Sequence, residues 1–463
     1  MNHLPNSTAA RDIATLIHPY TNLDRHMTTG PVVMTRGEGV YVYDDTGKRY
    51  LEGMAGLWST SLGFGEKRLV QAAVRQLEAL PYSQIFAHRS HEPAIDLAEK
   101  LLSMAPAGLD KVLFANSGSE ANDQAAKLVW YYHNAIGKPR KKKIISRVRG
   151  YHGVTVYSGS LTGLPGNHAD FDLPVGGVLR AECPSHYLYG LPGESEAAFV
   201  DRITGNLEQL ILREDPETIG AFIAEPVMGS GGVIVPPRGY FEKVQQILRR
   251  HNILFIADEV ICGFGRTGRM FGCETFGIQP DIMTVAKQLS SSYMPISATL
   301  VSAPIFEGML AESRKQGTFA HGFTYAGHPV AAAVALETLK IYEERDILGQ
   351  VQKTAPHFQA RLRALAEHPL VGEARGIGLI GAIEIVQDKA ARKPFATEEG
   401  IPAMAAAGAF RKGVIVRGIR DAIAFCPPLI ITESEIDELF DGVQHGLDEA
   451  LAHARSKGLT GAG

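Results

Sequence analysis

Residues 253–287 contain two apolar runs, and each run leads directly into a charged side chain. The first reads Ile253-Leu254-Phe255-Ile256-Ala257 and is followed by Asp258, and the second reads Ile282-Met283-Thr284-Val285-Ala286 and is followed by Lys287. Short apolar runs of this kind are typical of strands that are buried on both faces of a parallel sheet. The two runs therefore predict neighbouring strand ends that carry a carboxylate and an amine.

Two more strand-like runs also end in polar residues. Residues 112–115 lead into Asn116-Ser117-Gly118-Ser119, and residues 219–224 lead into Glu225. Because apolar runs alternate with helical patterns through residues 65–325, we expect βαβ units and a mainly parallel sheet. Ligands of open α/β sheets bind outside the carboxyl ends of the strands, so these polar strand ends predict one binding site.

The chemistry of these strand ends favours a phosphorylated pyridine cofactor. A glycine turn at the start of a helix, as in Ser117-Gly118-Ser119, offers free N–H groups to a phosphate, although an ordinary helix cap has the same pattern. A carboxylate such as Asp258 keeps a pyridine nitrogen protonated, which makes the ring an electron sink. A lysine such as Lys287 can form an imine and later move a proton. Either charged residue alone fits a structural ion pair or a capping group, but the three features together predict a site for pyridoxal 5'-phosphate.

Composition limits the classes of protein that fit. The chain has 463 residues, of which 45% are hydrophobic, and its formal net charge is -4, so neither disorder nor general nucleic-acid binding is expected. No apolar run approaches the roughly 18 residues of a membrane span, and no signal-peptide core stands near the start. We therefore expect a cytoplasmic protein with neither a membrane nor a nucleic-acid partner.

Neither a metal site nor a dinucleotide site is predicted. The four cysteines have no C-x-x-C spacing, and His88-x-x-His91 lacks an evident third ligand. Residues 263–268 match G-x-G-x-x-G, but no clear helix or βαβ unit follows them promptly. Both patterns fit structural roles better.

The most specific pattern in the chain is the segment 255–268, which reads Phe255-Ile256-Ala257-Asp258-Glu259-Val260-Ile261-Cys262-Gly263-Phe264-Gly265-Arg266-Thr267-Gly268. With Pro280-Asp281 and Ala286-Lys287, it resembles the signature of the class III aminotransferases, which have the fold-type I architecture of pyridoxal-phosphate enzymes. Further matches run from about Pro31 to the last helix: Ala55-Gly56-Leu57-Trp58, Gly118-Ser119-Glu120-Ala121-Asn122, Gly150-Tyr151-His152-Gly153, Ala224-Glu225-Pro226, His321-Gly322-Phe323-Thr324-Tyr325 and Cys426-Pro427-Pro428. The ω-amine:pyruvate transaminases are the subgroup that the chain resembles most.

The resemblance implies roles for the matching residues around the cofactor. Lys287 would carry pyridoxal 5'-phosphate as a Schiff base and act as the proton shuttle, and Asp258 would pair with the ring nitrogen. Tyr151 and Val260 would stack on the two faces of the ring, and Glu225 would stand near the ring hydroxyl or the substrate arginine. The remaining cofactor-binding candidates are Ser117, Gly118, Ser119, His152, Phe323 and Thr324. Thr324 would reach the phosphate of a neighbouring subunit, so the resemblance implies a homodimer with shared active sites, which can pair further into a tetramer.

The resemblance also implies a substrate pocket that contains one arginine. Arg417 matches the family's mobile arginine, which grips the carboxylate of a keto acid and swings away for an apolar amine. Arg420 is its local competitor, and Tyr20 is a candidate to close the pocket. The predicted pocket walls are Leu57, Trp58, Phe86, Tyr151 and Ser230. Such an aromatic pocket suits an alkyl or aryl amine.

We expect an α/β protein of three parts. Residues 1–35 form an irregular arm, residues 66–329 form a large cofactor-binding domain with a mainly parallel sheet, and residues 36–65 and 330–463 form a smaller α+β domain built from both chain ends. In the smaller domain, residues 40–51 predict a β-hairpin. Thr432-x-x-Glu435 predicts the capped start of the final helix.

The predicted reaction moves an amino group from an amine or ω-amino compound to pyruvate or a similar keto acid by a ping-pong mechanism. Within the same fold, a diamine (putrescine-type) transaminase, a decarboxylase and an aminomutase remain open. A catalytically silent binding protein is a third hypothesis, against which the intact Lys287 and Asp258 argue.

One position departs from the family pattern. After Lys287 the chain reads Gln288-Leu289-Ser290-Ser291-Ser292-Tyr293, with a serine at 292 where the family usually has glycine. If that glycine serves a positive φ angle, Ser292 costs about 1 kcal/mol.

Overall fold

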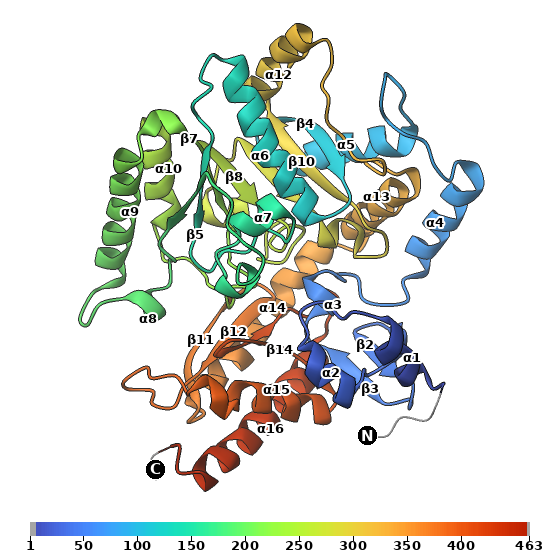
Figure 1. Cartoon of the computed structure of the whole chain (residues 1–463). Coiled ribbons are helices and arrows are strands. Elements are labelled where there is room, and N and C mark those ends of the chain that lie inside the picture. Colours follow the sequence, from blue (N-terminus) through green and yellow to red (C-terminus); the bar gives the residue numbers. More distant parts are fainter. Residues whose placement is uncertain (1–5, 461–463) are drawn as a thin grey trace.

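The central feature of the computed structural model, which describes residues 6–460, is a seven-stranded sheet (Figure 1). Its strand order is β4-β10-β9-β8-β7-β5-β6, and only β10 runs antiparallel to its neighbours. The prediction of a mainly parallel sheet is confirmed. The strands are β4 (Leu109–Ala115), β5 (Lys143–Arg147), β6 (Val178–Ala181), β7 (Ile219–Ala224), β8 (Leu254–Asp258), β9 (Ile282–Val285) and β10 (Ser297–Ser302).

Alternate side chains of this sheet pack into two separate cores, one on each face. Ile144 and Ile256 belong to one core, whereas their chain neighbours Ile145 and Phe255 belong to the other. The first core contains residues of α6 (Gly118–Ala135), α7 (Val156–Leu161) and α12 (Ala303–Gln316). The second contains residues of α5 (Glu92–Met104), α9 (Glu196–Arg213), α10 (Tyr240–Arg250) and α13 (Pro329–Glu344). Burial on both faces explains why the strands are continuous apolar runs in the sequence.

Two four-stranded sheets form the smaller part of the molecule. One has the order β1-β2-β3-β13, in which the short β13 pairs in parallel with β3 and so joins the two ends of the chain. The other has the order β11-β12-β15-β14. The strands are β1 (Met34–Glu38), β2 (Tyr41–Asp44), β3 (Arg49–Glu52), β11 (Val371–Ile377), β12 (Ile380–Ile385), β13 (Val414–Ile415), β14 (Arg417–Ile419) and β15 (Ala422–Phe425). Helices α14 (Ile347–Ala364), α15 (Ile401–Arg411) and α16 (Glu433–Ser456) accompany them, and the domain boundaries stay predictions.

Several local predictions can be compared with the structure. The hairpin is confirmed by antiparallel β2 and β3, and the capping box of Thr432 and Glu435 starts α16. The expectation of an irregular arm was wrong, because α1 (Thr8–Thr15) and α2 (Leu23–Thr29) form there. The side chains of Ser7 and Asn22 cap these two helices by accepting hydrogen bonds from backbone N–H groups.

The remaining elements are short, apart from helix α4. They are α3 (Ala55–Trp58), α4 (Lys67–Ala79), α8 (His186–Tyr189), α11 (Gly272–Phe276) and the 3-10 turns η1 (Pro165–Asn167), η2 (Pro216–Thr218), η3 (Lys287–Ser290), η4 (Leu365–Glu367) and η5 (Thr397–Glu399). Within residues 6–460, no helix combines the length and the apolar character needed to cross a bilayer.

Candidate active site

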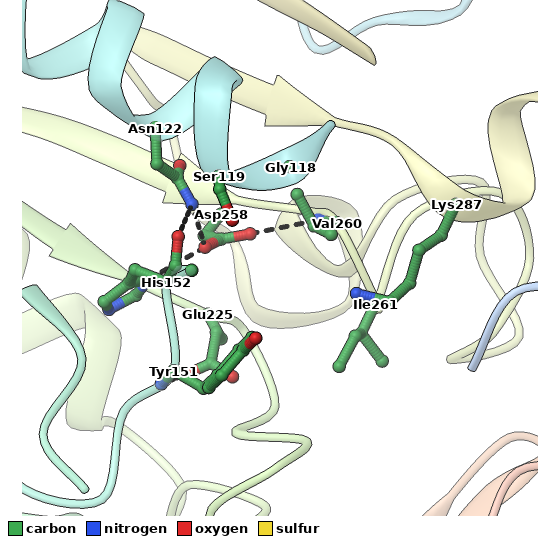
Figure 2. Close-up of a pocket in the computed structure, with 11 residues that line it drawn as sticks. Gly118, Ser119, Asn122, Tyr151, His152, Glu225, Asp258, Val260, Ile261 and Lys287 are labelled. Atoms are coloured by element: carbon green, nitrogen blue, oxygen red, sulfur yellow. Dashed lines mark hydrogen bonds and ion pairs between the residues drawn. The ribbon is translucent and has the colours of Figure 1, made fainter. Parts of the chain in front are cut away.

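The polar strand ends surround one cavity, which we call the cradle (Figure 2). It lies where β7, β8 and β9 end and where α6 begins, so the predicted convergence of these strand ends is observed. The residues that line it are Gly118, Ser119, Asn122, Tyr151, His152, Gly153, Glu225, Asp258, Val260, Ile261 and Lys287.

Asp258 is the most firmly held group of the cradle. It is the last residue of β8 and only 2% exposed. Its Oδ2 accepts hydrogen bonds from Asn122 Nδ2 and His152 Nδ1, both at 2.8 Å, and its Oδ1 accepts one from Val260 N at 3.1 Å. Three donors to one buried carboxylate fix its orientation.

Asn122 was quoted in a motif but given no role from the sequence. It lies one turn inside α6, where its Nδ2 also donates to the His152 carbonyl at 2.7 Å and its Oδ1 accepts from the Thr284 hydroxyl at 2.9 Å. His152 was predicted to bind the cofactor, and its ring both lines the cradle and lies directly behind Asp258. Both residues therefore position the carboxylate.

The start of α6 is built for close approach. The Ser117 hydroxyl caps the helix by accepting from Glu120 N at 3.2 Å, and the Ser119 hydroxyl accepts from Val154 N at 3.2 Å. A Cβ on Gly118 would stand 2.9 Å from a methyl carbon of Val260, which explains why this position is glycine. The prediction that the turn is a helix N-terminus is confirmed. The alternative, an ordinary helix cap, describes Ser117 but not Gly118 and Ser119, which line the cradle.

Lys287 begins η3 directly after β9, and its side chain points into the cradle (Figure 2). Burial lowers the pKa of its ammonium, and the nearby carboxylates of Asp258 and Glu225 oppose that shift. Among residues 6–460, Lys287 Nζ has no hydrogen-bonding partner. Its backbone has a φ angle of 45°, which is rare for a residue with a side chain and places it at a sharp turn.

Glu225 and Tyr151 form the side of the cradle away from Val260 (Figure 2). Glu225 follows β7 and accepts hydrogen bonds from Tyr151 N at 3.1 Å and Gly229 N at 3.2 Å. Burial raises the pKa of its carboxyl to about 7. Burial also raises the pKa of the Tyr151 hydroxyl, with a further contribution from its hydrogen bond to Tyr20.

A larger hollow opens beside the cradle and shares Tyr151 and Lys287 with it. It is lined by pocket candidates from five separate segments, together with Lys287 and with η1 and its neighbours: Pro19, Tyr20, Leu57, Trp58, Tyr151, Leu164, Pro165, Gly166, Asn167, Ser230, Lys287, Arg417, Gly418, Ile419 and Arg420. All predicted pocket residues except Phe86 are therefore brought together within one chain.

Phe86, Phe323 and Thr324 lie elsewhere in the chain, next to one another. A Cβ on Gly322 would stand 2.8 Å from the Phe86 ring, and the Thr324 carbonyl accepts a hydrogen bond from Tyr82 at 2.8 Å. Phe86 and Thr324 are exposed. The structure does not bring these three predicted site residues to the cradle or to the hollow of their own chain.

The residues present fit pyridoxal 5'-phosphate. The buried carboxylate of Asp258 suits a protonated ring nitrogen, the free Nζ of Lys287 suits attachment of an aldehyde, and the start of α6 suits a phosphate. The small residues Gly118 and Gly153 leave room there, since a Cβ on Gly153 would stand 2.6 Å from the Ser119 hydroxyl oxygen.

Comparison with known proteins agrees with this geometry. The chain matches the family model for aminotransferase class-III over residues 22–447. It is 52% identical to gamma aminobutyrate transaminase 3, chloroplastic, of Solanum lycopersicum. The match extends over 442 residues, which are 94% of this chain and 85% of that relative. It is 50% identical over 446 residues to a probable gamma-aminobutyrate transaminase 3, mitochondrial, of Oryza sativa subsp. indica, covering 96% and 88%. Because these relatives are named as organellar, the expectation of a cytoplasmic protein stays a prediction.

Solved structures of ω-transaminases share the whole fold. A thermostable six-fold mutant from Pseudomonas jessenii is 55% identical, with a TM-score of 0.95 and coverage of 96% of this chain and 98% of that one. The ω-transaminase from Pseudomonas jessenii in complex with PMP is 54% identical, with a TM-score of 0.96 and coverage of 98% and 100%. The chain belongs to the class III aminotransferases, which are fold-type I enzymes that use pyridoxal 5'-phosphate.

Proposed function

We propose that this aminotransferase moves an amino group from an apolar amine or an ω-amino compound to pyruvate or a similar keto acid. The observation that carries the proposal is the position of Arg417 in a hollow that also contains Leu57, Trp58 and Tyr151. A single guanidinium near Lys287 can grip the carboxylate of a keto acid, while the surrounding rings and methyl groups accept an apolar amine.

Arg417 is better placed for this work than Arg420, although both line the hollow. The charge of Arg417 acts on the reactive centre, because it helps to lower the pKa of Lys287 and opposes the raised pKa of Tyr151. The charge of Arg420 acts instead on Asp421. Within residues 6–460, the Arg417 guanidinium has no hydrogen-bonding partner, so it is free to bind a carboxylate or to turn away.

The cradle residues then divide the chemical work. Pyridoxal 5'-phosphate, when bound, supplies an electron sink that makes the hydrogen on the amine-bearing carbon acidic. Asp258 holds the proton on the ring nitrogen, and Lys287 is the point of attachment and the base that moves the substrate proton. Burial favours the neutral amine of Lys287, which is the form that accepts a proton. Tyr151 and Val260 both line the cradle and would hold the ring between them.

The remaining residues around the cradle bind and orient. Gly118 and Ser119 would hold the phosphate at the start of α6, whose first turn is capped by Ser117, and His152 keeps Asp258 in position through its hydrogen bond. Glu225 stands beside Tyr151, where its raised pKa of about 7 allows it to be neutral or charged near neutral pH. It is therefore suited to meet either the ring hydroxyl or the positive charge of Arg417.

A second candidate substrate class is favoured by the presence of two arginines in one hollow. An ω-amino acid carries a carboxylate at the end remote from its amine, and Arg417 or Arg420 could bind it. Curated relatives at about half identity are named γ-aminobutyrate transaminases, which agrees with this class. In this alternative the donor and the keto acid both need an arginine, whereas an apolar amine needs none.

The group of Phe86, Phe323 and Thr324, of which Phe86 and Thr324 are exposed, supports the proposal of a homodimer with shared active sites. Thr324 is exposed and lies beside two aromatic residues, and it does not line the cradle of its own chain. We infer that this group completes the cradle of a second copy. Mass photometry of the holoenzyme is expected to show a dimer or a pair of dimers, and a monomer that keeps full activity would contradict the shared site.

The experiment that tests the proposed reaction uses half-reactions. The holoenzyme is mixed with one donor at a time (an aryl-alkyl amine, γ-aminobutyrate or putrescine), and the loss of the cofactor's visible absorbance is followed. Pyruvate is then added, and alanine is measured. We expect a fast loss with the aryl-alkyl amine and one alanine per cofactor. A loss with γ-aminobutyrate alone would transfer the assignment to the second candidate, and no alanine with any donor would refute pyruvate as the acceptor.

A further inference from the structure

Three potential metal ligands converge in the N-terminal arm, outside the active site. Asp12 lies on α1, His26 lies on α2, and His18 lies in the connection between them. His18 Nε2 is 2.9 Å and 3.0 Å from the two carboxylate oxygens of Asp12, and His26 Nε2 is 3.1 Å from Asp12 Oδ1. In the described part of the chain this is the one group of three or more His, Cys, Asp or Glu residues whose ligand atoms all lie within 4.8 Å of one another.

The donor set and its spacing suit a divalent transition metal. Two imidazole nitrogens and one carboxylate oxygen are ligands that Zn²⁺ uses, and tetrahedral bonds of about 2.0–2.1 Å place neighbouring ligand atoms about 3.3 Å apart. The two observed N···O separations are within a few tenths of an ångström of that spacing. Only a small outward movement of the side chains is needed to admit an ion.

The burial of the three side chains fits a site that is closed on one side. The exposed fraction is 8% for His26, 16% for Asp12 and 27% for His18, so solvent reaches the group past His18. The centroids of the two imidazole rings lie 4.2 Å apart, so both rings flank the carboxylate of Asp12. An ion among the three side chains would take one ligand atom from each, with water free to complete the coordination.

We propose that Asp12, His18 and His26 bind one divalent transition-metal ion of the Zn²⁺ class. The spacing of six and eight residues in the sequence follows no known ligand pattern, and for that reason the sequence predicts no metal here. The chain turns between α1 and α2 (Figure 1). This turn brings the three side chains within hydrogen-bonding distance of one another. This binding site is separate from the aminotransferase reaction, and none of its ligands lines the cradle or the hollow.

The ion would brace the segment that closes the hollow. Tyr20 lies between His18 and His26 and lines the hollow, and its hydroxyl accepts a hydrogen bond from Asn167 at 2.6 Å. Its backbone has a φ angle of 52°, so the segment is held in an uncommon turn. A metal bound to residues on both sides of Tyr20 ties α1 to α2 and fixes that turn against the hollow.

The direct test measures metal binding to the cofactor-loaded enzyme, purified without a histidine tag. Zn²⁺ is added in the micromolar range and bound metal is counted per chain after gel filtration, with Co²⁺ as the spectroscopic probe. We expect one ion per chain and a Co²⁺ spectrum without thiolate bands, because the four cysteines are buried. His18→Gln, His26→Gln and Asp12→Asn should each weaken binding at least about tenfold, since even residues that only support a ligand are worth that much.

His445→Gln is the matched control, because His445 also pairs with a carboxylate, that of Glu449 at 2.9 Å, but has no third ligand beside it among residues 6–460. This variant should bind Zn²⁺ as the parent does. Equal binding by the parent and His18→Gln would place the metal elsewhere and overturn the proposal. No binding by the parent would do the same and leave a His–Asp–His hydrogen-bond cluster in its place.

Limited trypsin digestion gives a second measurement that a merely structural role would not move. Arg25 is exposed beside His26, so bound Zn²⁺ should slow cleavage after it several-fold in the parent and in His445→Gln, but not in His18→Gln. Cofactor absorbance and the melting curve show whether each variant is folded. If the buried His26→Gln loosens the arm by itself, the partly exposed His18→Gln decides, and zinc protection that persists in it would contradict the site.

Discussion

The cradle and the hollow differ in how firmly their side chains are held. In the cradle, Asp258 is 2% exposed and accepts three hydrogen bonds, and it comes from the end of a central strand. In the hollow, Tyr20 is 67% exposed and Leu57 is 58% exposed, and both come from the N-terminal part of the chain. The residues proposed to perform the chemistry are thus held by the sheet, whereas the residues proposed to meet the substrate include exposed side chains as well as the buried Trp58.

The difference follows from where each region comes in the fold. The cradle collects the ends of three neighbouring parallel strands and the start of one helix, and these cannot shift without disturbing both faces of the sheet. The hollow collects the arm, α3, η1 and β14, which belong to separate parts of the molecule. Substitutions in the cradle should therefore abolish the reaction, and substitutions in the hollow should select among substrates.

The largest expected effect is that of Lys287→Ala. The variant should fold and bind cofactor but lose multiple turnover, because no other amine lines the cradle in the described part of the chain. Alanine production is the measurement, and Lys67→Ala on the exposed face of α4 is the control. Multiple turnover by purified Lys287→Ala, without added amine base, would remove Lys287 from its role.

Asp258→Asn should have the next largest effect, at least about 100-fold on turnover, which corresponds to roughly 2.7 kcal/mol of barrier. The amide removes the charge that keeps the ring nitrogen protonated, and its NH₂ group meets the donors Asn122 and His152. Stopped-flow traces of the amine half-reaction measure the loss. Turnover within about threefold of the parent, or about 0.7 kcal/mol, would show that Asp258 is not the ring partner.

Arg417→Ala tests the other side of the comparison, since it should damage one half-reaction only. A desolvated arginine–carboxylate pair contributes roughly 1.5–3 kcal/mol, so the half-reaction with pyruvate should slow about 10- to 100-fold. The half-reaction with an apolar amine should lose little, because the amine has no carboxylate. The two halves are followed separately by cofactor absorbance.

Arg420→Ala is the matched control for Arg417, because it removes the second arginine of the same hollow. It should leave the pyruvate half-reaction nearly unchanged. If Arg417→Ala slowed the pyruvate and the amine half-reactions equally, Arg417 would be a structural residue. A loss with pyruvate in Arg420→Ala alone would transfer the role to Arg420.

Glu52→Gln should stabilise the protein in a pH-dependent way. Burial raises the pKa of Glu52 to about 7. Its Oε1 accepts a hydrogen bond from the backbone N of Met54, the residue just before the helix that contains Trp58. A raised carboxyl pKa means that folding binds a proton, so stability falls as pH rises from about 4.5 to about 7 and is then level. Glutamine keeps the acceptor without the charge.

The gain from Glu52→Gln should therefore be about 1–3 kcal/mol at pH 8 and should shrink toward pH 5. Melting temperatures of the holoenzyme at the two pH values measure it. An equal gain at both pH values would mean that packing, not charge, is responsible.

The sequence predicts the parts of the site that are local. Asp258, Glu225 and Lys287 each follow an apolar run, so their convergence could be predicted from strand direction alone. The hydrogen bonds from Asn122 and His152 to Asp258 depend on how a helix and a loop meet the sheet, which no run of residues encodes by itself. For the same reason the position of Phe86 outside the hollow, and the meeting of Asp12, His18 and His26, could not be predicted.

The smallest expected effect tests the turn that follows η3, where Ser291 and Ser292 both have positive φ angles, of 49° and 61°. Ser292 is exposed and its hydroxyl makes no hydrogen bond among residues 6–460, so Ser292→Gly removes only strain. The relief of about 1–2 kcal/mol is partly offset by the greater freedom of glycine in the unfolded chain, which leaves a gain of about 0.5–1 kcal/mol.

Ser291 is buried and its Oγ accepts a hydrogen bond from Leu62 N at 2.9 Å, so Ser291→Gly leaves that N–H without a partner, at a cost of about 1–3 kcal/mol. The two variants should move the melting temperature of the holoenzyme in opposite directions although they change adjacent residues with the same backbone conformation. A lower melting temperature for Ser292→Gly would mean that the serine stabilises the turn in a way that its φ angle does not reveal.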